Sequence, residues 1–416
     1  MSVKVYVETY GCTLNQAESD LMVGLLKEGG FSIVSSEREA DVVLLNTCTV
    51  KLSTENKIIA RIRRTKKPIV VAGCLWVLKE KIRDANRKTV ILPPSSLPLV
   101  ADAVRDAHTK KWTDYSLFAL DKNFSPRVYT APIQRVAVQE GCVGNCSFCQ
   151  TKLARPKLIS FDEEWIAEQI RKGVKNGAKE IQITGMDAGA YGLEKGTSLA
   201  KLLKKIIGID GDFFIRVGML NPHHVKRMLP ELIEVYKSEK LFKFLHVPVQ
   251  TGSEKVCRDM RRGHTVKDFV DVVEAFRKEI PEISVATDII VGYPTEGEED
   301  FQKTIALLKK IQPDVVNISK FTPREKTEAA GLKQLPTEVI KKRSVYLSRL
   351  VRNLLWEKNQ KFVGKIMDVL ITENFGDGVK GRTRNYKQVF IKRKIPLGGI
   401  VPAKVMRATN TTLFAV

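Results

Sequence analysis

Residues 133–150 read IQRVAVQEGCVGNCSFCQ, and this stretch decides the fold of the central part of the chain. A β-like run, Ile133–Glu140, leads directly into a loop whose cysteines, Cys142, Cys146 and Cys149, have the spacing C-x3-C-x2-C. Three thiolates at this spacing can bind three irons of a [4Fe–4S] cluster and leave the fourth iron open. Zinc is one alternative, but zinc prefers four ligands, usually as two C-x2-C pairs, and no second pair is present. Inert thiols are the other alternative.

An open iron in this loop would give the chain a specific chemistry. The iron can chelate the amino and carboxylate groups of S-adenosylmethionine (SAM) and pass it an electron. Reductive cleavage of SAM yields a 5′-deoxyadenosyl radical, which abstracts hydrogen from unactivated carbon. Gly141 and Gly144 allow the loop to wrap tightly around a cluster. The loop therefore predicts a radical-SAM catalytic site at Cys142, Cys146 and Cys149.

The region that begins with this strand repeats one strand–helix unit six times. Its candidate strands, all within residues 132–325, are Ile133–Glu140, Glu180–Gly185, Phe213–Gly218, Phe242–Val249, Ser284–Gly292 and Val315–Phe321. Six βα units in this order predict an α/β fold, a partial (β/α)6 barrel. In barrels of this kind the chemistry takes place at the carboxyl ends of the strands.

Polar residues and glycines follow several of these strands, where SAM would bind. Gly185 and Asp187, after the second strand, are candidates for contact with the methionine amino group. Gln250 and Ser253, after the fourth strand, are candidates for contact with the ribose. The remaining candidates are Arg216 and Asp288, together with Ile290 and Gly292 for the adenine. The alternative for each of these residues is ordinary turn chemistry.

Three further cysteines lie in residues 1–105, whose β-like runs and helical patterns alternate and predict a parallel α/β domain. Cys12, Cys48 and Cys74 each come just after a candidate strand, in KVYVETYGC, DVVLLNTC and PIVVAGC. Because the carboxyl ends of parallel strands meet at one edge of a sheet, the three thiols should converge. They predict a second cluster with an open iron, available to a sulfur donor. The alternative is three unrelated buried cysteines.

The composition is that of a globular protein with a large positive charge. The chain has 416 residues, of which 43% are hydrophobic, and a formal net charge of +22, which favours a polyanionic partner such as nucleic acid. A Lys-rich surface typical of heat-adapted proteins is the alternative. We find neither a run of about 18 apolar residues nor a signal peptide, and we expect a cytoplasmic protein without membrane contact. Seven cysteines, an odd number, argue against a disulfide framework.

The C-terminal part of the chain changes character. Residues 106–131 lack a clear period and are interpreted as a linker to the barrel domain, 132–350. Within and just beyond that domain, residues 336–360 have the pattern of one basic amphipathic helix. The last segment, 351–416, contains short β-like stretches broken by Gly and Asn, which predicts a small β-barrel. It carries 13 Lys and Arg against 4 Asp and Glu, a net of +9, and this concentration of charge favours RNA.

Together these motifs closely resemble the methylthiotransferase branch of the radical-SAM superfamily. The resemblance covers nearly the whole chain, from TYGCTLNQAESD through NTC and AGC to the cysteine loop and a terminal barrel similar to a TRAM RNA-binding domain. Within the branch, FCQTKLARP, DAGAYG, RVGMLNP, FLHVPVQTGS and ATDIIVGYPTE are similar to the archaeal and eukaryotic threonylcarbamoyladenosine tRNA methylthiotransferases. Relatives with other acceptors usually have a different run, ending in Arg-Gly, after the cysteine loop.

The resemblance implies conversion of N6-threonylcarbamoyladenosine at position 37 of tRNA, next to the anticodon, to its 2-methylthio form. It implies two [4Fe–4S] clusters and SAM. Cys12, Cys48 and Cys74 would hold the auxiliary cluster, and the loop cysteines would hold the radical cluster. The implied partners are the anticodon loop of tRNA, a reduced electron donor and a sulfur donor.

The chain departs from the family pattern at three places, and three alternatives stay open. Pro156 stands where Gly is usual, PREKT at 323–327 replaces Pro-Arg-Pro-Gly-Thr, and Cys257 replaces an aliphatic residue and is interpreted as packing. Arg155 and Lys152 are candidates for binding the threonylcarbamoyl carboxylate. The alternatives are another acceptor (isopentenyladenosine in tRNA or a ribosomal protein aspartate), a different sulfur or methyl chemistry, and a non-enzymatic RNA-binding protein with structural metal.

Overall fold

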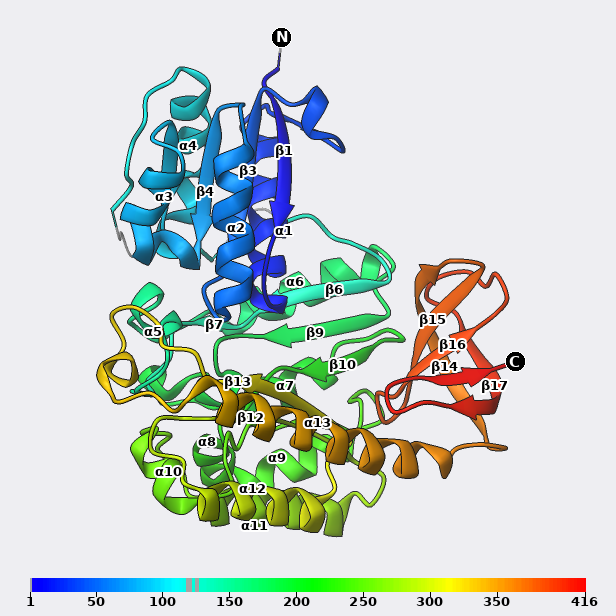
Figure 1. The fold of residues 1–416 in the computed structure, drawn as a ribbon. Helices are drawn as coiled ribbons and strands as arrows, with labels where there is room; N and C mark the ends of the chain where they lie inside the picture. Colours follow the sequence, from blue (N-terminus) through cyan, green and yellow to red (C-terminus); the bar gives the residue numbers. More distant parts are fainter. Residues whose placement is uncertain (1, 117–121, 124–126) are drawn as a thin grey trace.

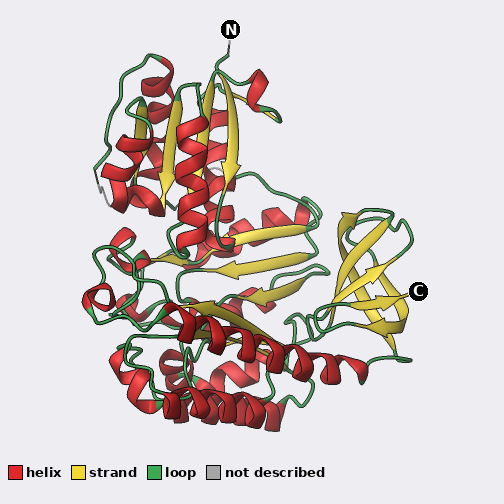
Figure 2. Cartoon of the chain, viewed as in Figure 1, coloured by secondary structure: helices red, strands yellow, loops and turns green. Residues whose placement is uncertain are grey.

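The structure is a computed structural model of the chain and describes residues 2–116, 122–123 and 127–416. It consists of an N-terminal α/β domain, a central open barrel and a small C-terminal β-barrel (Figure 1, Figure 2). The predicted fold class is therefore confirmed. The exact domain boundaries stay a prediction, and the predicted linker includes residues 117–121 and 124–126, which lie outside the described residues.

The N-terminal domain is a parallel sheet of five strands in the order β2-β1-β3-β4-β5, with a hydrophobic core on each face. Its strands are β1 (Lys4–Thr9), β2 (Ser32–Val34), β3 (Val42–Thr47), β4 (Ile69–Gly73) and β5 (Thr89–Leu92). Its helices are α1 (Thr13–Glu28), α2 (Leu52–Arg64), α3 (Lys79–Ala85) and α4 (Val100–His108). Every residue of β3 and β4 is buried, which explains why VVLLNT and IVVAG are continuous runs without alternation. The short β2 and β5 have no such signal and were not expected.

Helix α1 packs into two cores. Met22 and Leu26 contact the N-terminal sheet, whereas Leu14 and Ala17, nearer the start of the helix, pack into the core of the central barrel. The helix begins directly after Cys12. The apolar surface of α1 therefore fixes the position of the first cysteine relative to the barrel.

The central domain arranges six strands in one curved layer. One parallel sheet contains β6 (Ile133–Ala137), β9 (Glu180–Thr184) and β10 (Phe214–Val217), and the other contains β11 (Phe244–His246), β12 (Ser284–Val291) and β13 (Val315–Lys320). A bridge between Ile215 and Leu241 joins the two sheets, so the six βα units form one open barrel. Its helices are α5 (Thr151–Ala154), α6 (Glu163–Lys175), α7 (Leu199–Ile207), α8 (Pro222–Arg227), α9 (Leu229–Tyr236), α10 (Glu254–Asp259), α11 (Val266–Glu279) and α12 (Glu298–Ile311).

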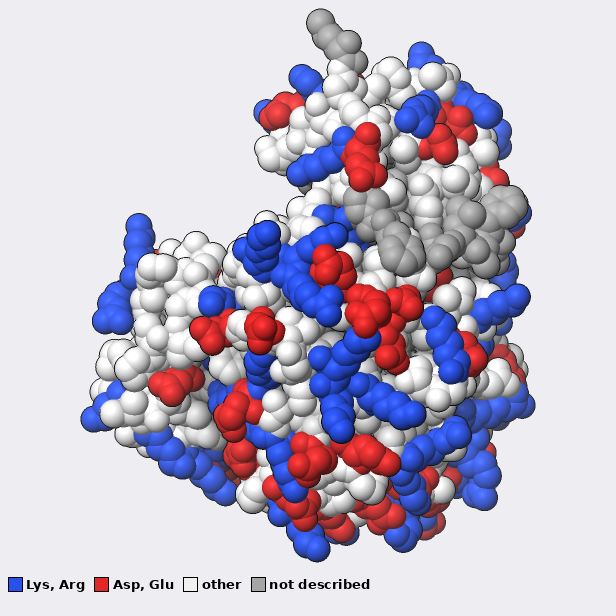
Figure 3. Space-filling model, turned by 180° about the vertical axis from the view of Figure 1, so that it is seen from behind, with Lys and Arg blue, Asp and Glu red and all other residues white. Residues whose placement is uncertain are grey.

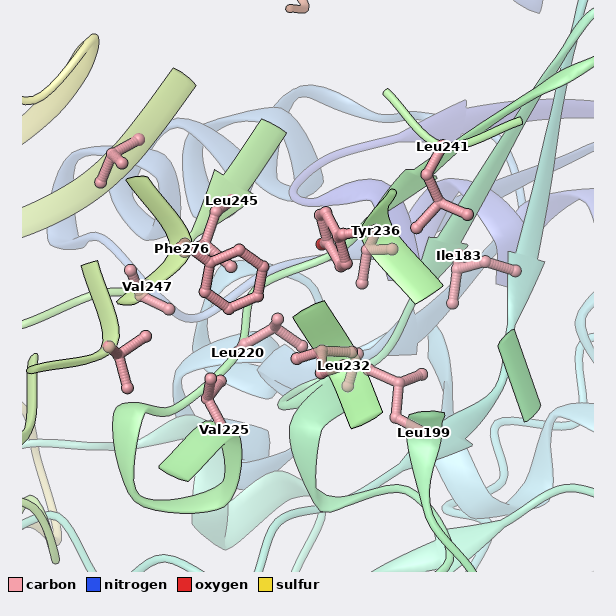
Figure 4. Packing of buried hydrophobic residues seen from close by; sticks show 14 of the residues in the cluster. Ile183, Leu199, Leu220, Val225, Leu232, Tyr236, Leu241, Leu245, Val247 and Phe276 are labelled. Carbon is pink, nitrogen blue, oxygen red and sulfur yellow. The ribbon is translucent and has the colours of Figure 1, made fainter. Parts of the chain in front are cut away.

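The barrel is held together by an apolar layer between its strands and its outer helices. Figure 4 shows this packing, with Leu245 from β11, Tyr236 from α9 and Phe276 from α11 in one cluster. The rings of Tyr236 and Phe276 meet edge to face, with centroids 5.2 Å apart. Cys257 is in the same core and 1% exposed, in agreement with its interpretation as packing.

Two of the predicted barrel strands are at least three residues shorter than expected. The first ends at Ala137, and after Val138 the residues Gln139–Glu140 (β7) pair antiparallel with β8 (Ile159–Ser160) to form the base of the cysteine loop. The fourth ends at His246, ahead of Pro248, which has no N–H to donate, and Gln250, which adopts a φ of +74°. Both interruptions occur at the end of the barrel that carries the candidate site.

The C-terminal part consists of α13 (Thr337–Gln360) and a closed five-stranded barrel in the order β14-β15-β16-β18-β17. Its strands are β14 (Ile366–Phe375), β15 (Gly378–Thr383), β16 (Gln388–Ile391), β17 (Ile400–Ala408) and β18 (Leu413–Ala415). β15 was not expected, because its glycines lower strand propensity. A Cβ on Gly381 would lie 2.4 Å from the Leu370 carbonyl oxygen, so this strand pairing needs glycine. The boundary predicted between residues 350 and 351 falls within α13.

The C-terminal barrel packs against the end at which the central strands begin, opposite the cysteine loop (Figure 1). The hydroxyl of Tyr386 donates to the Glu180 carboxylate at 2.6 Å, and its ring lies 4.8 and 4.9 Å from the rings of Phe242 and Phe244. Helix α13 runs beside β13. With 24 residues, it is about 36 Å long. Within the described ranges, no helix combines the length and the apolarity that crossing a membrane requires.

Candidate active site

The cysteine loop forms the first part of the site. Gly141 adopts a φ of +73°, and a Cβ there would lie 1.6 Å from the Lys157 carbonyl oxygen, so only glycine fits. A Cβ on Gly144 would lie 3.3 Å from the Cys142 Sγ and 3.8 Å from the Cys146 Sγ. The Gly144 N–H also donates to the Cys142 sulfur at 3.2 Å. The loop therefore folds the sulfurs of Cys142 and Cys146 over Gly144, a shape that a cluster can occupy.

A buried arginine, Arg262, contacts this loop from the turn after α10. Its Nη1 donates to the Cys146 sulfur at 3.3 Å, and its Nη2 donates to the Pro248 carbonyl oxygen at 3.2 Å. A guanidinium group in hydrogen-bond contact stabilises a thiolate relative to a thiol. Nothing in the sequence marks Arg262, because RRG at 261–263 is an ordinary basic turn.

The second set of thiols lies where β1, β3 and β4 end. Gly11 has a φ of +113°, and a Cβ there would lie 2.8 Å from the Cys48 Cβ, so the segments carrying Cys12 and Cys48 are in contact. Gly73, with a φ of +90°, packs as closely against the end of β3 and places Cys74 at the same edge. The parallel sheet thus brings together three cysteines that are distant in the sequence.

Burial keeps most of these sulfurs protonated at neutral pH. It raises the pKa of Cys74 to about 12 and the pKa of Cys142 to about 11. It also raises the pKa values of Cys48 and Cys149. Because the thiolate is the metal ligand, occupation of either site must release these protons. Higher pH therefore favours metal loading at both sites.

A buried ion network connects the two sets of thiols. Arg155, just past the cysteine loop, donates to both carboxylate oxygens of Glu18 at 2.6 Å and, from Nε, to the Cys74 sulfur at 3.3 Å. Glu140, just ahead of the loop, accepts from Arg155 at 3.3 Å, and Lys122 pairs with both carboxylates. All four charged side chains are buried. The network therefore ties α1 and the end of β4 to the base of the cysteine loop.

This network corrects one expectation from the sequence. Arg155 was a candidate for binding the threonylcarbamoyl carboxylate, but it is 3% exposed and all three of its nitrogens are engaged within the protein. Its main partner, Glu18, lies 137 positions away in the chain, and a separation of this size hides the pairing from a sequence pattern. The ammonium group of Lys152 donates to the Cys142 carbonyl oxygen.

The candidates after β9 lie next to the loop and also have structural roles. Asp187 is near enough to Cys142 to raise the pKa of that thiol. Its Oδ1 accepts the N–H groups of Gly189 and Asn221 at 3.1 and 3.0 Å, and burial raises its pKa to about 6. A Cβ on Gly185 would lie 2.8 Å from Gln139 Nε2. Contact of these two residues with SAM stays a prediction.

The candidates after β11 and β12 lie beside one another. Gln250 and Ile290 are joined by a backbone hydrogen bond of 2.9 Å, and Ile290 packs in a small cluster with Phe148 of the cysteine loop. Gly292 follows with a φ of +80°. The Ser253 hydroxyl donates to an Asp300 carboxylate oxygen at 2.6 Å and caps α10, so a contact with the ribose would have to compete with this bond.

Arg216 and Asp288 lie at different levels of the barrel. The guanidinium group of Arg216 lies 5.6 Å above the Phe244 ring, which also packs on Tyr386, so it is directed toward the C-terminal barrel. Asp288 accepts from Asn317 at 2.7 Å and faces His246 Nε2 at 3.3 Å. Although burial alone would raise the pKa of Asp288, these two partners bring it below its ordinary value, so the carboxylate is ionised. The structure therefore groups Asp288, but not Arg216, with the other candidates.

The two sets of thiols do not have the geometry of a zinc site. In the part of the chain that the structure describes, no three His, Cys, Asp or Glu side chains are close enough to bind one metal ion. Ligands of a four-iron cluster bind different irons and stand farther apart than those of a single zinc ion. The donor set of the loop, with Cys142 and Cys146 close to Gly144 and Cys149 in the same short segment, fits a cluster.

Comparison with known proteins agrees with this geometry. Family models match residues 136–308 as the radical SAM superfamily, 4–92 as the uncharacterized protein family UPF0004 and 360–416 as a TRAM domain. A probable threonylcarbamoyladenosine tRNA methylthiotransferase of Archaeoglobus fulgidus is 44% identical over 97% of this chain and 96% of its own. A threonylcarbamoyladenosine tRNA methylthiotransferase of Drosophila melanogaster is 34% identical, over 99% of this chain and 77% of its own. The chain belongs to the threonylcarbamoyladenosine tRNA methylthiotransferase family.

As a member of this methylthiotransferase family the chain is a radical-SAM enzyme, and it uses a [4Fe–4S] cluster and SAM. Solved structures share the fold. The radical SAM methyltransferase TsrM of Kitasatospora setae has a TM-score of 0.59 at 13% identity, with 79% of this chain and 74% of that chain covered. The cobalamin-dependent radical enzyme OxsB has a TM-score of 0.54 at 12% identity, with 84% and 56% covered.

Proposed function

We propose that this enzyme transfers a methylthio group to C2 of N6-threonylcarbamoyladenosine at position 37 of tRNA. The observation that carries the proposal is the joining of two three-thiol sites by one buried network, in which Arg155 contacts both Cys74 and Glu140 at the base of the cysteine loop. The cysteine-loop site suits radical formation, and the N-terminal site suits delivery of sulfur. The reaction needs both sites at one atom of the substrate. The names of the relatives supply the acceptor nucleoside.

In this proposal each set of thiols holds a [4Fe–4S] cluster. Cys142, Cys146 and Cys149 hold the radical cluster, and Cys12, Cys48 and Cys74 hold the auxiliary cluster. When bound, the clusters and SAM supply the sulfur, the methyl group and the radical that removes hydrogen from C2. The proposed SAM contacts are Gly185, Asp187, Gln250, Ser253, Asp288, Ile290 and Gly292. Arg216 is left out because it is directed toward the C-terminal barrel.

The chain's own residues orient the sulfurs and cover part of the segment that follows the cysteine loop. Arg155 and Arg262 each donate a hydrogen bond to one ligand sulfur, which fixes the direction of that side chain. The N-terminal domain also covers the short helix after the loop, where Trp76 Nε1 donates to the Ala154 carbonyl oxygen at 3.2 Å. A covered site protects a radical from solvent.

A basic and aromatic stripe on α13 would receive the RNA. The stripe is exposed, recurs at helical spacing and consists of Lys342, Tyr346, Arg349, Asn353 and Trp356. Because α13 runs from the mouth of the barrel to the C-terminal barrel, it connects the candidate site with the basic terminal domain (Figure 1). Cationic side chains bind phosphates, and exposed aromatic rings stack on unpaired bases.

A second row of side chains crosses the outside of the C-terminal barrel. The strand register places Lys380 beside Phe390, Phe390 beside Phe414, and Phe414 beside Arg407, whose guanidinium group lies 4.1 Å from the Phe414 ring centroid. Aromatic rings flanked by cations on a small β-barrel are typical of surfaces that bind single-stranded RNA. Lys and Arg also spread over much of the rear face (Figure 3), so this pattern, and not charge alone, indicates the RNA path.

The test is an acceptor comparison with the purified, reconstituted enzyme. SAM, a reductant and sulfide are supplied, together with tRNA that carries adenosine, isopentenyladenosine or threonylcarbamoyladenosine at position 37. We expect a 2-methylthio product only on the last, detected by mass spectrometry of the nucleosides. In the source organism, deletion of the gene for this enzyme should remove the 2-methylthio nucleoside from cytoplasmic tRNA. Reintroduction of the wild-type gene should restore the nucleoside, whereas a gene encoding Cys48→Ala should not. An unchanged level in the deletion strain would contradict the proposal.

The same experiments identify the alternatives. A product on isopentenyladenosine, or on a ribosomal protein, would assign a different acceptor, and a different product on the same tRNA would assign a different chemistry. We expect about eight irons per chain and a brown protein after anaerobic reconstitution. A colourless protein with stoichiometric zinc would instead indicate an RNA-binding protein with structural metal.

A further inference from the structure

A second buried contact links the two sets of thiols, separately from the Arg155 network. Thr49 directly follows Cys48, and Gln150 directly follows Cys149. The Thr49 hydroxyl donates to the Gln150 side-chain oxygen, although the two residues are 101 positions apart. The exposed fractions of the two residues are 0% and 3%, so water does not compete for this bond.

Arg324 joins this contact from the loop after β13. Its Nη2 donates to the Gln150 side-chain oxygen at 2.7 Å and to the Thr49 carbonyl oxygen at 3.0 Å. The same nitrogen is paired with the Glu55 carboxylate, which balances its charge. The Gln150 side-chain amide in turn donates to the Glu325 carbonyl oxygen at 3.1 Å. Three segments that are distant in the sequence therefore meet between Cys48 and Cys149.

The two links attach different cysteines of each set. The Arg155 network ties Cys74 to Glu140, just ahead of Cys142. The Thr49–Gln150 contact ties the segment of Cys48 to the segment of Cys149, at the other end of the loop. The packing of α1 into the barrel core already holds the N-terminal domain on the barrel, and the two links add buried polar attachments beside the thiols. Two attachments at separate points oppose both pivoting and separation.

We propose that Thr49, Gln150 and Arg324 are positioning residues that set the distance and orientation between the two metal sites. This inference rests on the proposed function, in which both sites act on one atom of the substrate. A displacement of about 1 Å in such an arrangement costs about 100-fold in rate. The contact thus controls whether a radical formed at the loop is used on the substrate, and not whether the radical forms.

The test separates radical formation from its use. Thr49→Val removes the hydroxyl at constant size, and Thr49→Ser keeps it. Thr65→Val is the matched control, because Thr65 is also buried and, among the residues that the structure describes, its hydroxyl bonds with Arg61 at the end of α2 and not with the barrel. In the reconstituted enzyme with threonylcarbamoyladenosine-containing tRNA, 5′-deoxyadenosine is measured per methylthiolated nucleoside. We expect Thr49→Val to raise this ratio about tenfold or more at an unchanged rate of SAM cleavage, and the other two variants to keep the wild-type ratio.

Two further readouts need no product. Electron paramagnetic resonance of the fully reduced protein reports the magnetic coupling between the two clusters, which Thr49→Val should weaken. Hydrogen–deuterium exchange of the metal-free protein should accelerate at residues 48–55 and 141–156 in this variant. If Thr49→Val does not fold, Gln150→Met serves in the same tests.

The inference would be overturned if Thr49→Val kept the wild-type ratio of 5′-deoxyadenosine to methylthiolated nucleoside, the wild-type coupling between the clusters and the wild-type rate of hydrogen–deuterium exchange. Failure of the proposed function looks different, because the wild-type protein would then form no methylthiolated nucleoside. In that case, the coupling and exchange measurements would still decide whether the contact fixes the two sites.

Discussion

The two sets of thiols show two ways in which a chain can assemble a metal site. Cys142, Cys146 and Cys149 lie in one short loop, held at its base by the β7–β8 ribbon. The N-terminal thiols come from the ends of three separate strands and meet only because the sheet has the order β1-β3-β4. The loop site is therefore a local structure, whereas the N-terminal site depends on the whole domain and on the contacts that dock it.

The electrostatic surroundings of the two sites differ in the same way. Arg155, beside Cys74, is neutralised by carboxylates from two domains. Arg262, beside Cys146, is instead near Asp187, and burial raises the pKa of that carboxyl group to about 6. Cys74 is thus in direct contact with an interdomain ion network, whereas Cys146 contacts an arginine of its own barrel.

Loss of one thiol should distinguish the two sites most strongly. Cys146→Ala should abolish SAM cleavage, whereas Cys48→Ala should cleave SAM and form no methylthiolated nucleoside. Each variant should lose about four of about eight irons, since one cluster is lost in each. Iron analysis, 5′-deoxyadenosine assays and nucleoside mass spectrometry measure these effects, with Cys257→Ala as the buried control. SAM cleavage by Cys146→Ala would rule out the assignment of the loop.

Removal of the Arg155 charge should have the next largest effect. Arg155→Met removes one of the two ion-pair partners of the buried carboxylates of Glu18 and Glu140 and leaves Lys122 as the other, and it should lower the free energy of unfolding by about 3–5 kcal/mol. Denaturant titration of the metal-free protein measures this loss. Arg171→Met, which removes two exposed ion pairs, with Glu164 and Glu168, should change stability by less than about 1 kcal/mol. Equal effects of the two substitutions would show that the network does not hold the domains.

Asp187 should give the loop side a specific pH dependence. Burial raises its pKa from 3.8 to about 6, so the folded state binds the proton more tightly than the unfolded state. The resulting stabilisation is complete below about pH 4 and disappears as the pH rises through about 6. Relative to Asp187→Asn, the free energy of unfolding of the metal-free wild type should fall over this range by at most about 3 kcal/mol. Parallel pH profiles for the two proteins would refute this prediction.

The smallest expected effect concerns the edge of the N-terminal sheet. Gly73 and Gly30 both have positive φ, +90° and +82°, but a Cβ on Gly73 would lie 2.5 Å from Asn46 Oδ1, whereas a Cβ on Gly30 meets nothing within 4 Å. Gly73→Ala should therefore cost about 1 kcal/mol more than Gly30→Ala, because steric overlap adds to backbone strain. It should also lower the iron content of the N-terminal site. Thermal unfolding and iron analysis measure both effects, and identical results for the two variants would show that the edge is loosely packed.

Much of the architecture follows from local patterns. The six barrel strands and the continuous apolar runs of β3 and β4 are visible in the sequence, because side-chain burial repeats along each element. The short β2 and β5 are not, since three or four residues carry too little pattern. β15 is also not visible in the sequence, because its glycines have low strand propensity. They are present because the close packing of this strand leaves no room for a Cβ.

The sequence by itself determined the cysteine loop and, through the geometry of parallel strands, the convergence of Cys12, Cys48 and Cys74. Only the tertiary structure decided what surrounds them. Arg155 has the sequence context of a solvated charge and is buried against Glu18, and Arg324 meets Thr49 across 275 positions. The physical reason is that spacing along the chain encodes which face of an element is buried. The partner of a buried polar group depends instead on which distant segments pack together.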